Sequence, residues 1–109
     1  MAKTLRVLTG TITVADGTGS ITLSAVKYRA IIDSGGYLEQ VLVTVPNESV
    51  DFDFLITDTD GYVPFDLRGH KGKINDITRV PMKGTYTLSI ANATINGTYT
   101  FKLMFREQW

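Results

Sequence analysis

The chain has 109 residues and a mass of 12.0 kDa, the size of one domain with a single hydrophobic core. Eleven Lys and Arg balance eleven Asp and Glu, so no overall basic field favours nucleic acid or an anionic membrane. The absence of cysteine and the single histidine exclude disulfides, thiolate nucleophiles and multi-histidine or cysteine-type metal sites. We therefore expect one domain, residues 1–109, with no cofactor and neither nucleic acid nor a membrane as partner.

The N-terminal residues do not resemble a targeting segment. Only a short apolar run precedes Thr9 and Gly10, and it is too short for the core of a signal peptide. No apolar run approaches the roughly 20 residues that span a bilayer. The sequence accordingly predicts a protein made in the cytoplasm.

The first expected strand carries an irregularity. Its apolar residues move from odd positions, Leu5 and Val7, to even positions from Leu8 onward. Because a strand keeps its apolar side chains on one face by strict alternation, this change predicts a β-bulge between Leu8 and Gly10.

Alternation of apolar and polar residues predicts strands along the rest of the chain. It is clearest at residues 50–56, where apolar residues alternate with Asp51 and Asp53 on the expected solvent face. Pro64 predicts that a neighbouring short strand lies on the edge of a sheet. The expected strands after the first are 20–26, 28–32, 37–45, 50–56, 63–67, 74–80, 85–90 and 98–105.

Turn residues separate these strands, and no window of 11 residues has apolar residues at helical spacing with plausible caps. Roughly eight short strands of this kind predict an all-β fold, an antiparallel β-sandwich of jelly-roll or immunoglobulin-like type, with a closed barrel as the alternative. Aromatic residues occupy inward positions and are expected in the core: Phe52, Phe54, Tyr86, Tyr99 and Phe101.

The acidic residues around Asp58 and Asp60 do not fit a calcium loop. When they are aligned before Gly61 in the calcium-loop pattern, the first and last ligand positions fall on Ile56 and Leu67, which are apolar. We expect the segment 58–61 to close a hairpin and no metal site to form.

His70 is expected in a glycine-flanked loop, residues 68–72, where it could serve as a general base. No nucleophile elbow, phosphate-binding glycine loop or paired-carboxylate motif accompanies it. We therefore expect no enzymatic activity.

Charge is unevenly distributed along the sequence. Residues 30–67 contain eight acidic residues and no Lys or Arg, whereas residues 68–109 contain seven basic and two acidic residues. Two oppositely charged surfaces would favour contacts between identical subunits or docking on a charged lattice, but folding could equally interleave the two segments. The residues that we expect at such an interface are Arg68, Lys71, Lys73, Arg106 and the C-terminal Trp109.

Four further aromatic residues have no clear place in the core: Tyr28, Tyr37, Tyr62 and Trp109. If several of them share one exposed face, they could stack on sugar rings. Otherwise they cap the ends of the sandwich or pack at a subunit contact.

The segments Thr13–Ser20, Asp53–Gly61 and Gly84–Thr94, with a Gly-Gly turn into a valine-rich strand, resemble small all-β structural proteins of tailed bacteriophages. The resemblance implies a virion component such as a head decoration (cement) protein, often a symmetric oligomer. It carries over no catalytic residue. Residues 51–105 are also similar to the pre-peptidase C-terminal type of β-sandwich, a module that accompanies secreted hydrolases.

Together these features predict a non-enzymatic virion structural protein on the capsid surface. Its expected partners are the major capsid protein and further copies of itself, and it would stabilise contacts between capsid subunits by repeated weak binding. A carbohydrate-binding or adhesion module is the first alternative, and a tail or head-fibre component is the second.

Overall fold

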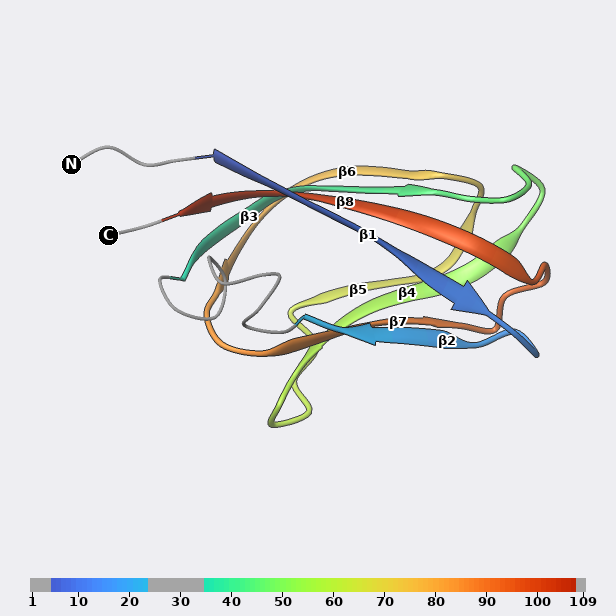
Figure 1. Ribbon diagram of the computed structural model, residues 1–109, viewed down its shortest axis with the longest axis horizontal. Coiled ribbons are helices and arrows are strands. Elements are labelled where there is room, and N and C mark those ends of the chain that lie inside the picture. The colour runs from blue at the N-terminus through green and yellow to red at the C-terminus, as the bar shows by residue number, and fades with distance from the viewer. Residues whose placement is uncertain (1–4, 24–34, 108–109) are drawn as a thin grey trace.

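The computed structural model describes residues 5–23 and 35–107. In this part of the chain, eight strands form two four-stranded antiparallel sheets that pack face to face (Figure 1). The strands are β1 (Leu5–Val14), β2 (Gly19–Thr22), β3 (Gly36–Thr44), β4 (Asp51–Asp58), β5 (Phe65–Lys71), β6 (Ile74–Met82), β7 (Tyr86–Ala91) and β8 (Gly97–Glu107).

The strand order identifies the sandwich as a jelly roll. One sheet has the order β1-β8-β3-β6 and the other β2-β7-β4-β5, so successive strands cross between the sheets except for the β4–β5 hairpin. This interleaving is that of a double-sheet jelly roll with Greek-key connections. The predicted all-β sandwich is thus confirmed, and the immunoglobulin-like and closed-barrel alternatives are wrong.

The core lies between the two sheets and is rich in aromatic side chains. Tyr99 is fully buried; its hydroxyl donates a hydrogen bond of 2.6 Å to the carbonyl oxygen of Ile95, and its ring packs edge-on against Phe52. The other large side chains in the core include Phe54, Phe101, Phe105, Ile12 and Leu88. The five aromatic residues expected in the core are all buried.

No bulge interrupts β1, contrary to the prediction. The strand pairs with β8 in an unbroken register from Leu5 opposite Arg106 to Val14 opposite Gly97. The odd residues point away from the core throughout, and Leu5 and Val7 are 46% and 51% exposed. The shift of apolar residues from odd to even positions therefore reflects two apolar side chains on the outer face. The side chains of the strand continue to alternate between its two faces without interruption.

The predicted loop at residues 68–72 is also wrong, since β5 continues to Lys71. β5 bulges against β4 between the pairs Phe54–Leu67 and Phe52–His70, and Gly69 there has a φ of 62°. Because glycine adopts this backbone conformation easily, it allows a bulge, and the strand continues through a segment whose residues are typical of a loop. β5 is an edge strand that begins directly after Pro64, as predicted.

Asp53 lies on β4 but is not on an open solvent face as predicted. Its side chain is 8% exposed and accepts two hydrogen bonds of 2.8 Å, from the backbone N–H of Gly69 and from Nδ2 of Asn92. These two bonds, with a smaller contribution from the charge of Arg68, hold the pKa of the Asp53 carboxyl below its usual 3.8. The backbone N–H of Gly69, at the bulge, is thus one of the donors that offset the cost of burying the Asp53 carboxylate.

The expected hairpin at residues 58–61 is confirmed, because Oδ1 of Asp58 accepts hydrogen bonds of 2.9 Å from the backbone N–H groups of Asp60 and Tyr62.

Within residues 5–23 and 35–107, no group of three or more His, Cys, Asp or Glu side chains is arranged to hold a metal ion. No helix with the length and apolarity to cross a membrane occurs in the same ranges. The expected strand 28–32 and part of the strand 20–26 lie outside the described residues.

Candidate functional site

The outer face of the β1-β8-β3-β6 sheet carries apolar side chains on each of its four strands, with polar residues such as Gln40 between them. The cross-strand register aligns Val7 with Met104, Met104 with Gln40, and Gln40 with Ile77. Ile77 is 86% exposed, although it lies on a strand. We call the following residues, which come from all four strands, the apolar face: Leu5, Val7, Leu42, Ile77 and Met104.

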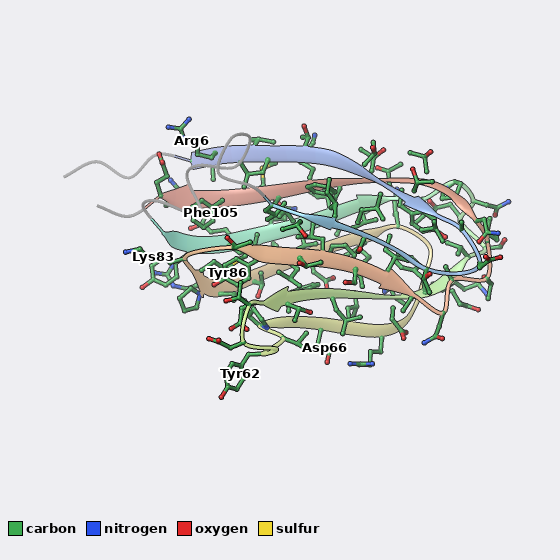
Figure 2. The ribbon with its side chains drawn as sticks, turned by 60° about the horizontal axis from the view of Figure 1, so that its bottom comes forward. Arg6, Tyr62, Asp66, Lys83, Tyr86 and Phe105 are labelled. Carbon is green, nitrogen blue, oxygen red and sulfur yellow. The ribbon has the colours of Figure 1, made fainter. Side chains whose placement is uncertain are left out.

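One ion pair borders the apolar face: Nε of Arg106 lies 3.1 Å from Oε2 of Glu39. A second pair lies on the inward side of the same sheet, near the chain ends, where Nε of Arg6 lies 3.0 Å from Oε2 of the buried Glu107. Figure 2 shows Arg6 at the margin of the sheet. Of the four predicted interface residues that the structure describes, Arg106 lies beside the apolar face.

The other predicted interface residues are placed elsewhere. Arg68 lies on β5 of the opposite sheet, 2.8 Å from the Asp66 carboxylate, which projects away from the sandwich in Figure 2. Lys71 ends the same strand opposite Asp51, and Lys73 lies in the β5–β6 turn. Trp109 lies outside the described residues. The structure therefore does not gather the predicted set on one surface.

The acidic and basic segments of the sequence are interleaved in space. The pairs Glu39–Arg106 and Asp66–Arg68 each join one residue from the acidic segment to one from the basic segment. Because antiparallel strands bring distant parts of the chain together, the charge segregation seen along the sequence does not persist at these positions.

His70 stabilises the β5–β6 turn. Its Nε2 lies 2.8 Å from the carbonyl oxygen of Lys73, and its ring packs edge-on against Phe52 with centroids 6.1 Å apart. This arrangement anchors the ring between the turn and the core, and gives it a structural role.

The tyrosines without an expected place in the core do not share one exposed face within the described residues. Tyr62 is 73% exposed at the β4–β5 turn of one sheet, and Tyr37 is half-buried on β3 of the other. The guanidinium carbon of Arg79 lies 4.4 Å from the centre of the Tyr37 ring. Tyr28 and Trp109 lie outside the described residues.

A second candidate site is an open cleft of about 430 Å³ at one end of the sandwich. Figure 2 shows two of its residues, Lys83 and Tyr86, at that end. The cleft forms where the start of β3 pairs with the end of β6, beside the β6–β7 turn. It is lined by Gly35, Gly36, Tyr37, Pro81, Met82, Lys83 and Tyr86. Sequence reasoning missed this site, because it placed Tyr86 in the core and did not bring Tyr86 together with the Gly-Gly pair and Tyr37.

Comparison with known proteins gives no family assignment. No protein family and no curated protein matches the sequence. Among solved structures, one similar chain is the CBM36-1 domain of a multidomain xylanase from the hindgut metagenome of Trinervitermes trinervoides, at 12% identity and a TM-score of 0.37. That alignment covers 96% of this chain and 94% of the other.

Another similar chain is a family two carbohydrate esterase from Cellvibrio japonicus, at 11% identity and a TM-score of 0.38. The alignment covers 98% of this chain but 35% of the esterase, so this chain spans about a third of that protein's length. At these scores neither neighbour's activity transfers to this chain.

Proposed function

We propose that this chain is a non-enzymatic structural protein that docks on another protein through the apolar face. The partner that we propose is the major capsid protein of a tailed bacteriophage, with this chain as a decoration protein on the outer head surface. The observation that carries the proposal is the patch of apolar side chains from all four strands, with Ile77 and Val7 86% and 51% exposed. The resemblance to phage structural proteins supports the choice of partner.

The physical basis is burial of apolar surface on docking. Each square ångström of apolar surface removed from water contributes about 25 cal/mol, but ordering and polar desolvation oppose this gain. A small patch on a flat sheet therefore gives weak binding per copy. Repetition on a symmetric shell converts weak contacts into stable attachment through avidity.

The edges of the same sheet support self-association. β1 and β6 are both edge strands of the sheet that carries the apolar face. Edge strands have unpaired backbone groups that can pair with another chain. We propose that copies of this chain associate laterally along these edges when they are bound to the shell.

The test combines light scattering with co-sedimentation on undecorated heads of the phage that encodes the chain. In a V7T/I77T double variant, threonine keeps the β-branched shape but lowers the apolarity of the patch, so we expect the variant to remain folded and to pellet less with heads. A Y62S variant removes a side chain of intermediate exposure, 73%, from the β4–β5 turn of the opposite sheet and should pellet like the wild type. Equal pelleting of the double variant and the wild type would refute this use of the apolar face.

A carbohydrate-binding or adhesion module is the second candidate function. The end cleft favours it, because two tyrosines and a proline line a cavity whose volume falls within the range typical of ligand sites. Screening the whole chain on a glycan array tests it, and saturable binding to any one glycan class supports it.

A further inference from the structure

The end cleft combines an apolar wall with positive charge that has no carboxylate partner among residues 5–23 and 35–107. Pro81 lies opposite Tyr37 in the β3–β6 register, so a ring and a proline stand side by side. Such a pair offers a flat apolar surface to the C–H face of a sugar ring. The wall is held in place by the strand pairing and by Arg79, which packs on the Tyr37 ring.

Backbone without side chains forms another part of the cleft. Gly35 has a φ of 71°, and a Cβ added there would lie 3.1 Å from Cβ of Lys83. A Cβ on Gly36 would lie 2.1 Å from the carbonyl oxygen of Arg106. These two glycines thus let β3 enter the sheet closely while leaving space beside the Lys83 side chain.

Tyr86 supplies a polar group that is fixed in position. Its side chain is 7% exposed, and its hydroxyl oxygen accepts a hydrogen bond of 3.0 Å from the backbone N–H of Lys83. A tyrosine hydroxyl also has one proton to donate, and no acceptor for it occurs among residues 5–23 and 35–107. This proton is therefore available to a ligand oxygen.

Two cations border the cleft without a partner carboxylate. Neither Lys83 nor Arg79 lies within ion-pair distance of an acidic side chain in the described ranges. The nearest acidic residue on β3, Glu39, is paired with Arg106. No lining residue is acidic, and Glu107, which lies opposite Gly36, is paired with Arg6, so the charges of the described residues favour an anion at the cleft.

We propose that the end cleft binds an acidic saccharide of the uronic acid class. The sugar ring lies against Tyr37 and Pro81, its carboxylate pairs with the Lys83 ammonium, and a ring oxygen or hydroxyl accepts the proton of Tyr86. This assignment rests on the second candidate function and specifies the ligand class. The cleft adjoins the apolar face, because Leu5, Arg106, Tyr37 and Pro81 follow one another in a single cross-strand row.

The experiment is calorimetric titration of the whole chain with trigalacturonate and, as the matched neutral sugar, galactotriose. We expect saturable binding of trigalacturonate that weakens as salt is raised, because salt screens the charge interaction. A K83Q variant should bind trigalacturonate about tenfold more weakly, the loss expected for one charge-assisted contact. A K71Q variant removes one exposed charge from β5, far from the cleft lining, and should bind like the wild type.

Two further variants separate stacking from charge. Y37A should weaken binding of either sugar, and Y86F should weaken binding while leaving the ring in place; circular dichroism checks that each variant is folded. Equal affinity for both sugars, or no effect of K83Q, would overturn the acidic selectivity while leaving the carbohydrate function standing. Absence of binding to both sugars at millimolar concentration would overturn the cleft proposal and count against the carbohydrate function itself.

Discussion

At the residue scale, Asp53 is one of two charged residues that are buried within the described ranges, the other being Glu107. Asp53 is buried on a strand whose neighbouring residues face the core, and both of its carboxylate oxygens accept hydrogen bonds. A buried charge is costly unless such bonds compensate it. The Gly69 N–H and the Asn92 amide therefore make the ionised form of Asp53 the stable one.

Replacing the carboxylate by an amide tests this dependence. In D53N one side-chain oxygen becomes an NH₂ group, which cannot accept from the Gly69 N–H or the Asn92 Nδ2 that it faces. We expect the free energy of unfolding to fall by about 1–3 kcal/mol, the cost of leaving a buried polar group unsatisfied. Urea denaturation at pH 7 measures the change, and an exposed D60N substitution in the β4–β5 turn serves as control.

The same residue predicts a pH dependence. Because the pKa of Asp53 is lower in the folded chain than in the unfolded chain, its stabilising contribution is fully present above the unfolded pKa of 3.8. That contribution is lost as pH falls through the folded pKa. Unfolding free energies measured between pH 6 and pH 2 should therefore fall more steeply for the wild type than for D53N, and parallel curves would contradict this account.

At the element scale, the bulge in β5 depends on the backbone conformation of Gly69. A Cβ at this position would meet no atom within 4 Å, so any penalty for a side chain comes from its φ of 62° and not from crowding. We expect G69A to lose about 1–2 kcal/mol of stability, the cost of the left-handed region for an ordinary residue. G69N should lose less, since asparagine tolerates this region, and equal losses in thermal melts would refute the explanation.

The elements also show which features the sequence could predict. Apolar alternation found β4, β7 and β8 because their buried apolar residues recur at every second position, as at Phe52 and Phe54. It failed at β1, where Leu5 and Val7 are apolar for a reason other than burial in the core. It failed at β5, because residues 68–72 contain two glycines and polar residues, as a loop does. The strand nevertheless continues through Gly69 to Lys71.

The candidate sites were less predictable than the strands. The apolar face depends on cross-strand register, which places Met104 between residues of β1 and β3. The cleft depends on the pairing of Gly36 with Met82, two residues far apart in the sequence. Neither neighbourhood follows from local pattern, because strand order in a jelly roll is set by packing of the whole chain.

At the scale of the whole molecule, each sheet contains strands from both halves of the sequence. β1 pairs with β8, and β2 pairs with β7, so no continuous half of the chain forms a sheet alone. We expect unfolding to be a single cooperative transition. Far-ultraviolet and near-ultraviolet circular dichroism should give coincident urea curves, whereas separated midpoints would indicate that part of the sandwich is stable by itself.

The pairing of β1 with β8 also affects how the protein is made. Leu8, Ile12 and Val14 lie on β1, but β8, the strand that pairs with β1, is synthesised after the other described strands. At typical rates of 5–20 residues per second, the stretch from Val14 to Glu107 takes roughly 5–20 s to translate. For most of that time the nascent chain exposes an apolar strand with no partner, so folding is completed after β8 emerges, and chaperones that shield apolar segments have their main opportunity to act on β1.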